Sequence, residues 1–281
     1  MRDIKMIVTD FDDTFYVHNP AGSWKVDNPA ALNEARDAGI FVYPCTARPW
    51  PQAAKLIADF NFNNLCVHDN GAAIVRIDSD ETIFQKSMSR DIVEAVLDFA
   101  QRYDLVTQIC AARFMGYFTP NGKTKEEQIK KTMESINLDK FAFFLSNSIE
   151  EALETYQDNC LLIRFIIEPE DGSISKAMED ELLSLRDIEV TWSHLRAMDI
   201  MAKGVNKGDG LEKLAKLTGV SLKNIMALGD AKNDASMLKI AGFGVAMGDA
   251  AQITKDAADY VSENAVDSGF AKAVRKFALG K

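Results

Sequence analysis

Apolar and polar positions alternate in two different ways along the chain. Near both ends, short apolar runs take turns with longer stretches in which apolar residues recur at helical spacing. We expect strands at residues 5–9, 40–44, 65–68, 225–228 and 243–247, and helices at residues 29–38, 51–60, 207–217, 235–241 and 269–277. This alternation is typical of a parallel sheet whose crossover connections are helices. A hairpin is expected between residues 72 and 85.

The middle of the chain, from about residue 86, has a different pattern. We expect strands at residues 105–111, 114–118, 161–167 and 189–193, and helices at residues 90–103, 125–136 and 175–185. This mixture predicts a small α+β module. The fold class is therefore predicted to be α/β, with a Rossmann-like, doubly wound parallel sheet as the core (residues 1–85 and 190–281) and an inserted α+β domain (residues 86–189).

Composition narrows the class of protein. Of the 281 residues 47% are hydrophobic, as in an ordinary globular protein with a sizeable core. The net charge of −10 argues against nucleic acid and anionic membranes as partners. No stretch is apolar enough to cross a bilayer, and the N-terminus lacks the apolar run of a secretory signal. The four cysteines form no CxxC pair, so we expect reduced thiols and a cytoplasmic location.

Three aspartates end the first predicted strand, in the stretch MIVTDFDDTF. Asp10 and Asp12 lie two positions apart, so both side chains can face one crevice, and Asp13 follows them. Carboxylates this close repel one another unless a cation or a hydrogen-bond network lies among them. We interpret Asp10 and Asp12 as part of a Mg²⁺ site that also supplies a nucleophile and an acid/base. The alternative is a solvated acidic turn that caps a helix.

A second acidic cluster follows the predicted strand at residues 225–228. The stretch ALGDAKND places Asp230, Asn233 and Asp234 directly after it. Mg²⁺ prefers hard oxygen ligands and keeps some of its waters, so a few carboxylates suffice. Asp and Asn are also ordinary turn residues, so this cluster alone is modest support. Open parallel sheets bind ligands where their strands end, and two such clusters favour one shared metal site.

Two further segments have the chemistry of phosphate binding. In YPCTARP, the Thr46 hydroxyl and the Ala47 amide can hold phosphate oxygens where a strand passes into a helix. In KGVNKGDG, Lys207 stands at a helix start and can reach a phosphate while offsetting carboxylate charge. Each has a plainer interpretation taken alone: a helix N-cap for Thr46 and a solvated surface side chain for Lys207.

These segments, in this order, resemble the haloacid dehalogenase (HAD) superfamily of phosphohydrolases. DFDDT, beginning at Asp10, is similar to the first motif, DxDxT; Thr46 and Lys207 stand for the second and third motifs, and GDAKND is similar to the fourth, GDxxND. DNGA at residues 69–72, GFGVAMGDA at residues 242–250 and the position of the insert resemble the Cof-type subfamily. In that subfamily an α/β cap domain of the C2/IIB type lies between the second and third motifs.

The resemblance implies a Mg²⁺-dependent phosphatase that acts on a small phosphorylated metabolite, such as a sugar phosphate. Asp10 would attack phosphorus to form an aspartyl-phosphate, and Asp12 would act as acid and then as base. The implied Mg²⁺ ligands are Asp10, the backbone carbonyl of Asp12, and Asp230, with Asp234 supporting them. The residues implied to bind the phosphoryl oxygens are Thr46, Ala47, Lys207 and Asn233.

Two alternatives fit the same motifs. A phosphomutase of the phosphomannomutase-like branch would pass the phosphoryl group from Asp10 to another hydroxyl, and a non-catalytic protein would keep only phosphate binding. Asp13 and Asp249 replace residues common in the family, and we assign neither a role. Arg113 and Arg164 of the insert are candidates for reading a second acidic group on the substrate, although each is more often a surface ion pair. The sequence does not select the substrate or the oligomeric state.

Overall fold

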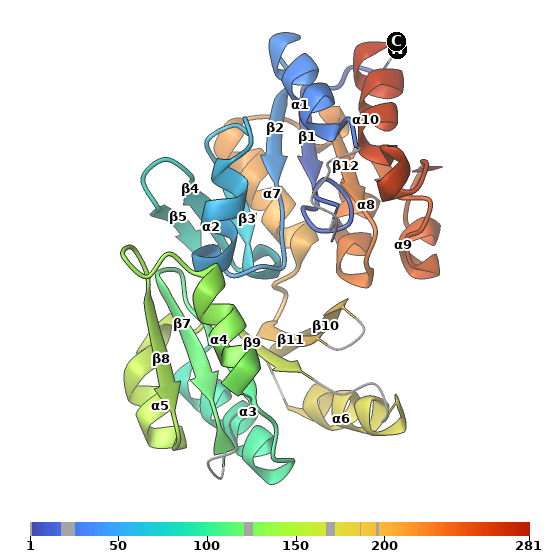
Figure 1. Ribbon diagram of the computed structural model, residues 1–281. Helices are drawn as coiled ribbons and strands as arrows, with labels where there is room; N and C mark the ends of the chain where they lie inside the picture. Colours follow the sequence, from blue (N-terminus) through green and yellow to red (C-terminus); the bar gives the residue numbers. More distant parts are fainter. Residues whose placement is uncertain (1, 18–25, 121–125, 167–171, 186, 195–196) are drawn as a thin grey trace.

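A parallel sheet forms the core of the protein (Figure 1). The computed structural model describes residues 2–17, 26–120, 126–166, 172–185, 187–194 and 197–281. The sheet has the strand order β14-β13-β12-β1-β2. Its strands are β1 (Met6–Thr9), β2 (Phe41–Pro44), β12 (Ile225–Gly229), β13 (Phe243–Ala246) and β14 (Tyr260–Val261). All neighbouring pairs are parallel, which confirms the α/β class with a parallel core sheet.

Strand β1 lies inside this sheet, between β12 and β2, because its sequence, MIVT, is apolar or β-branched throughout. All four residues are fully buried, as expected for a central strand covered on both faces. Thr9 lies opposite Leu228 of β12, and the backbone N–H of Asp10 donates to the Leu228 carbonyl at 2.9 Å. The two acidic clusters therefore leave the sheet side by side.

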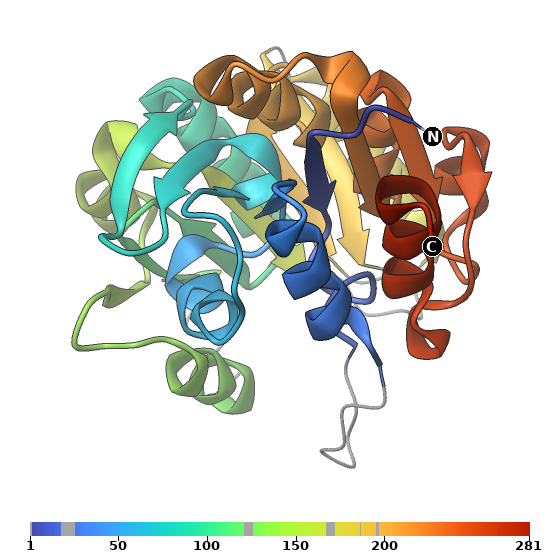
Figure 2. The ribbon, with the colours of Figure 1, turned by 90° about the horizontal axis from the view of Figure 1, so that it is seen from above.

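Helices cover both faces of the core sheet, as in a doubly wound fold (Figure 2). Helices α1 (Asn28–Asp37) and α10 (Gly269–Ala273) pack together on one face, and α7 (Lys207–Thr218) and α8 (Ala235–Ile240) pack together on the other. Helices α2 (Trp50–Ala58) and α9 (Gln252–Asp256) complete the core.

The strand expected at residues 65–68 is present but belongs to a different sheet. Strand β3 (Cys66–His68) pairs antiparallel with β4 (Ala73–Arg76), which pairs with β5 (Glu81–Gln85). A single bridge between Cys45 and Val67 joins β3 to the end of β2. The expected hairpin is therefore confirmed, whereas residues 65–68 join the parallel sheet only through this one parallel bridge, because the ladder of β3 is the antiparallel one with β4.

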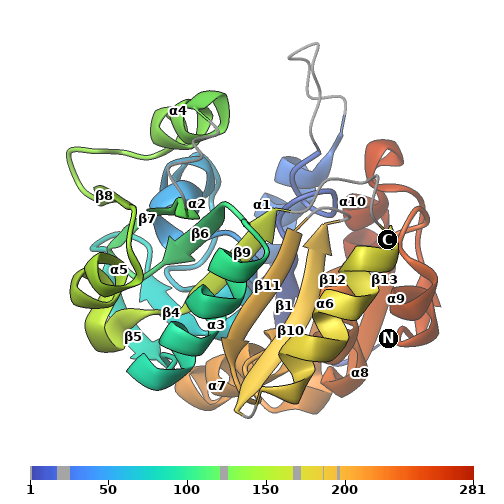
Figure 3. The same cartoon turned by 90° about the horizontal axis from the view of Figure 1, so that it is seen from below.

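The insert forms a six-stranded sheet in the order β10-β11-β9-β6-β7-β8 (Figure 3). Its strands are β6 (Thr107–Cys110), β7 (Phe114–Phe118), β8 (Ala142–Ser146), β9 (Leu162–Ile166), β10 (Ile188–His194) and β11 (Ala197–Ala202). Its helices are α3 (Arg90–Arg102), α4 (Glu126–Ser135), α5 (Ile149–Tyr156) and α6 (Gly172–Ser184). Helices α3 and α6 cover the face of this sheet that points away from the core (Figure 3).

The chain passes between the two parts at two adjacent places. The Lys86 ammonium donates to the Lys203 carbonyl at 2.8 Å, so the outgoing and returning segments lie together. Strand β11 pairs with β9, and β10 pairs with β11. We therefore propose residues near 86 and 203 as the domain limits, because a boundary at residue 190 would cut β10.

The described residues include no helix long and apolar enough to cross a membrane. All four cysteines are buried free thiols, as the sequence predicted.

Candidate active site

Three carboxylates meet where β1 and β12 end. Oxygen atoms of Asp10, Asp230 and Asp234 all lie within 4.8 Å of one another. Asp10 follows β1, whereas Asp230 and Asp234 flank the short turn after β12. The main chain shapes this turn, because Asp234 Oδ2 accepts the N–H groups of Asp230 and Ala231, each at 2.9 Å. Three hard oxygen donors at this spacing suit a divalent cation such as Mg²⁺.

Lys207 enters the same cluster from the start of α7. Its ammonium donates to Asp10 Oδ1 and to Asp234 Oδ1, each at 2.5 Å, and its side chain is 1% exposed. Asn206 caps the helix by accepting the Asp209 N–H at 3.0 Å, which fixes where α7 begins. Burial lowers the pKa of Lys207, but Asp10 and Asp234 outweigh it and raise that pKa above its ordinary value. Lys207 is therefore a buried cation and not a solvated surface side chain.

Burial disfavours the ionised forms of two of these carboxylates, Asp10 and Asp230. Burial is the largest cause that raises the pKa of Asp10 well above its ordinary value, although Lys207 opposes it. Burial, followed by the charge of Asp234, raises the pKa of Asp230 to about 7. The Thr14 hydroxyl donates to Asp230 Oδ1 at 2.6 Å and partly offsets this effect. A bound cation would favour the charged forms of Asp10 and Asp230.

The carboxylate of Asp12 does not join this cluster. It forms a bidentate ion pair with Arg48, with Nε to Oδ2 at 2.7 Å and Nη2 to Oδ1 at 2.6 Å. Any contact of Asp12 with a metal would thus come from its backbone. Arg48 was not among the predicted site residues, although its position two residues after Thr46, in the same loop, was a usable signal.

The loop after β2 holds Thr46 and Ala47 at the same edge of the sheet as the acidic cluster. Thr46 is 1% exposed, and its N–H donates to the Val67 carbonyl at 2.9 Å. Its hydroxyl accepts the Arg48 N–H at 3.0 Å. The Ala47 carbonyl accepts from Arg164 Nη2 at 3.0 Å. Thr46 therefore shapes its own loop.

A series of buried hydrogen bonds between polar side chains links the turn after β12 to the insert. Asn233 Nδ2 donates to Asn70 Oδ1 at 2.8 Å, and Asn70 Nδ2 donates to Asp199 Oδ2 at 2.7 Å. Asp199 in turn binds Arg164 of β9, with Nε to Oδ1 at 2.5 Å and Nη2 to Oδ2 at 2.9 Å. The Arg164 side chain is 13% exposed and paired with the fully buried Asp199, so it is a largely buried ion pair and not a surface one. Asn70 was predicted only as part of the DNGA motif and Asp199 was not predicted, although a lone Asp inside the apolar run AMDIMA was a signal for Asp199.

The two departures from the family pattern have structural roles. Asp13 adopts the left-handed conformation with φ 54°, and its N–H donates to the Tyr16 carbonyl at 2.8 Å, as in a tight turn. Asp249 accepts the Ala265 N–H at 3.3 Å and joins two loops. Arg113 donates to the backbone carbonyl of Asp80 at 3.1 Å, which connects the insert to the β4–β5 hairpin.

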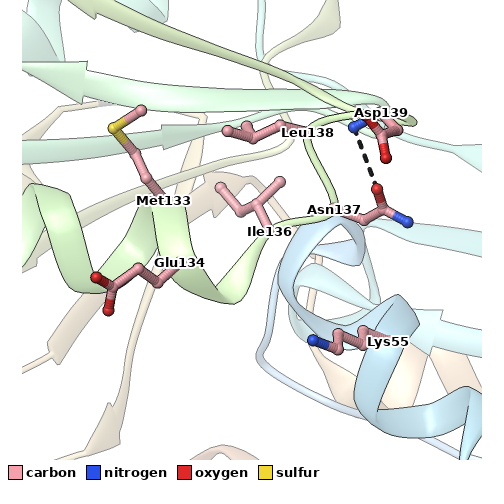
Figure 4. A pocket seen from close by; sticks show the side chains of 7 residues that line it. All are labelled: Lys55, Met133, Glu134, Ile136, Asn137, Leu138 and Asp139. Carbon is pink, nitrogen blue, oxygen red and sulfur yellow. Dashed lines mark hydrogen bonds between the residues drawn. The ribbon is translucent and has the colours of Figure 1, made fainter.

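Two cavities bear on where a substrate could bind. The larger, about 510 Å³, lies between α2 and the segment after α4 and is lined by Lys55 and residues 133, 134 and 136–139 (Figure 4). None of these residues belongs to the acidic cluster or its partners. A smaller cavity of about 210 Å³ is lined by Lys207, Asn233 and Asn70 of the site and by Glu189 and Thr191 of β10. Because site residues line the smaller cavity, we favour it as the place where a substrate binds.

Comparison with known proteins agrees with this geometry. A family model described as haloacid dehalogenase-like hydrolase matches residues 7–274. The chain is 28% identical over 282 residues to a Bacillus subtilis protein named 5-amino-6-(5-phospho-D-ribitylamino)uracil phosphatase YcsE, covering 99% of this chain and 97% of that protein. The fold is similar to that of the phosphatase BT1666 from Bacteroides thetaiotaomicron (TM-score 0.79, 25% identity, 98% and 96% of the chains covered). It is also similar to the HAD subclass IIB sugar phosphatase BT4131 (TM-score 0.78, 25% identity, 98% and 99% covered).

Proposed function

The chain belongs to the haloacid dehalogenase-like hydrolases, and from this premise we propose that it is a Mg²⁺-dependent phosphatase working through an aspartyl-phosphate on Asp10. The observation that carries the proposal is the group of Asp10, Asp230 and Asp234 around the ammonium of Lys207. Mg²⁺ bound there would shield the nucleophile from the incoming phosphoryl dianion and neutralise the equatorial oxygens.

The donor set suits this ion. Asp10 and Asp230 offer carboxylate oxygens, the backbone carbonyl of Asp12 completes the protein's share, and waters would fill the remaining positions. Asp234 is engaged by Lys207 and by two backbone N–H groups, so we assign it to holding the other groups in place. The Thr14 hydroxyl orients Asp230 in the same way.

In the first half of the reaction, a carboxylate oxygen of Asp10 attacks phosphorus and the bond to the leaving oxygen breaks. Asp12 gives that oxygen its proton, so the product alcohol leaves neutral. Because Arg48 holds the Asp12 carboxylate in the resting protein, protonation of Asp12 requires this ion pair to loosen as substrate binds.

In the second half, Asp12 takes a proton from the water that attacks the aspartyl-phosphate. The oxygen–phosphorus bond to Asp10 then breaks, which frees the carboxylate and releases inorganic phosphate. The pairing with Arg48 favours the charged form of Asp12 that this step needs. One residue can thus act as acid and then as base.

Four groups bind the phosphoryl oxygens in this proposal. They are the Thr46 hydroxyl, the Ala47 N–H, the Lys207 ammonium and the Asn233 amide. Lys207 lies against Asp10 already, so its charge is placed where the phosphoryl group would arrive.

We propose a phosphate monoester on a small polyhydroxylated molecule as the substrate. The relatives' names support this choice, because a ribityl chain and a sugar are both polyols. The cavity beside Lys207 and Asn233 adds Glu189 and Thr191 as hydrogen-bonding partners for hydroxyls.

The experiment is a panel of phosphorylated sugars, polyols and nucleotides assayed for phosphate release with Mg²⁺ and with EDTA. We expect release that requires Mg²⁺ and favours polyol phosphates. Transfer to a second hydroxyl without phosphate release would instead indicate a mutase, and no turnover with any ester would indicate a binding protein. A cytoplasmic location belongs to the same proposal, and fractionation of cells tests it.

A further inference from the structure

Asn70 lies between the two segments that are expected to hold the phosphoryl group. It is fully buried in the short turn η1 (Asp69–Gly71) and has the left-handed conformation, with φ 56° and ψ 28°. Asn tolerates this conformation better than most residues, whereas a residue with a bulkier side chain would be strained there. Nothing in the reaction above uses Asn70.

The main chain of Asn70 sets the direction of the Ala47 N–H. The Asn70 N–H donates to the Thr46 carbonyl at 3.2 Å. That carbonyl and the Ala47 N–H belong to the same peptide unit, and the described residues contain no cis peptide bond. In a trans peptide the two groups point in opposite directions. The Ala47 N–H is therefore turned away from Asn70.

The side chain of Asn70 sets the direction of the Asn233 amide. A carboxylate only accepts hydrogen bonds, so Asp199 fixes which end of the Asn70 amide faces it. Asn70 then presents its oxygen to Asn233, which must turn its own NH₂ group toward Asn70. This leaves the second N–H of Asn233 for another acceptor. The direction in which the oxygen and the NH₂ group of each amide point therefore follows from the carboxylate of Asp199.

The insert holds Asp199, the charged end of this series of hydrogen bonds, in place. Arg164 of β9 holds both oxygens of Asp199 and also donates to the Ala47 carbonyl. Arg164 is 13% exposed and Asp199 is fully buried. A single guanidinium therefore reaches the loop of Ala47 directly and the turn of Asn233 through two intermediates.

We propose that Asn70 is a positioning residue, which orients the Ala47 N–H with its main chain and the Asn233 amide with its side chain, while the Arg164–Asp199 pair holds it in place. The inference rests on the proposed function, because it assumes that both groups bind the phosphoryl oxygens. It assigns Arg164 to positioning, not to reading the substrate.

The test measures binding of inorganic phosphate to the Mg²⁺-loaded protein by calorimetry, together with kcat and KM for a hydrolysed ester. Asn70→Gly keeps the left-handed turn and its N–H but removes the side-chain link. We expect its phosphate Kd to rise about tenfold, because one charge-assisted hydrogen bond loses its direction. Asn70→Asp alone should weaken binding more, since two carboxylates would then face each other.

The double change N70D/D199N restores a donor opposite an acceptor between positions 199 and 70 and between positions 70 and 233, but it turns the new NH₂ group toward Arg164 Nη2. We therefore expect a partial rescue, with a phosphate Kd at least about threefold lower than that of Asn70→Asp. Tyr156→Phe is the control for lost stability, because it removes a buried hydrogen bond to the Ile109 carbonyl, 3.1 Å long, in the same sheet. Its thermal midpoint should fall while its phosphate Kd stays unchanged.

Three outcomes would overturn the inference: an unchanged phosphate Kd in Asn70→Gly, an equal loss in Tyr156→Phe, or no rescue in the double variant. The proposed function fails separately, if the wild-type protein hydrolyses no ester. In that case the phosphate Kd of Asn70→Gly, compared with that of the wild-type protein, still tests the positioning role. A wild-type protein that binds no phosphate would refute the positioning role.

Discussion

Replacing Lys207 by Met tests the balance of charge on which the site depends. Met keeps much of the length of the side chain but removes its charge, so Asp10 and Asp234 would face each other without the ammonium that now lies 2.5 Å from each. Asp234 is fully buried and the Asp10 side chain is 9% exposed, so water cannot replace the lost partner well. Breaking a buried ion pair in this way costs about 3–5 kcal/mol.

The loss should be visible as a lower thermal midpoint. About 3–5 kcal/mol corresponds to a fall of roughly 6–20 °C for a protein of about 150–250 residues, and to slightly less for a chain of 281 residues. The assay is thermal unfolding in EDTA, followed by circular dichroism. Mg²⁺ should restore part of the loss, because a divalent cation among the three carboxylates supplies the missing positive charge.

Lys213→Met is the matched control on the same helix. Lys213 is partly exposed and lies 3.9 Å from Asp209, so its pair contributes at most about 1 kcal/mol. If Lys207→Met in EDTA is no less stable than Lys213→Met, the buried ion pair does not have the role assigned to it.

Three further predictions concern the carboxylates. Asp10→Asn should lower kcat for p-nitrophenyl phosphate at least about a thousandfold, or about 4 kcal/mol of barrier, and hydrolysis at the wild-type rate would rule out Asp10 as the nucleophile. Thr14→Val removes the hydroxyl that donates to Asp230, so the Mg²⁺ concentration for half activation should rise about tenfold or more; an unchanged value would contradict this role. Without metal, raising the pH from about 4 to about 7 should lower the free energy of unfolding by up to about 4 kcal/mol. The reason is that the pKa of Asp230 is raised from 3.8 to about 7 in the folded protein, so folded Asp230 keeps a proton that the unfolded chain has already released. Urea unfolding in EDTA across this range measures the effect, and a stability that rises with pH would be the wrong sign.

The parts of the site that the sequence predicted are those that follow from local pattern and sheet geometry. A fully apolar run ending in Asp10 and another ending before Asp230 indicate two central parallel strands. The carboxyl ends of such strands meet at one edge, so the acids had to lie close together once the strands were neighbours. Strands β1 and β12 are such neighbours, because they pair in parallel.

The parts that the sequence did not predict depend on pairing between distant segments. Strand β11 has the same apolar pattern whether it joins the core sheet or the insert, and only its pairing with β9 decides between them. Strand β8 was not predicted, although its sequence, AFFLS, is a short apolar run; it is largely exposed at the sheet edge, and only its pairing with β7 places it in the six-stranded sheet. The ion pair of Asp12 with Arg48 spans 36 positions. No local pattern indicates which acid a given Arg will choose.

The pairing of Arg48 with Asp12 clarifies why the remaining charges favour a divalent cation. With Asp12 balanced by Arg48, the cluster contains three carboxylates and one ammonium, which leaves two negative charges when all are ionised. A monovalent ion would leave the site negative, and protons would neutralise Asp10, the acid that we propose as the nucleophile. A divalent cation makes the site neutral while Asp10 stays ionised, and a phosphoryl dianion can then approach it. The raised pKa values of Asp10 and Asp230 are the expected response of the same acids when that charge is absent.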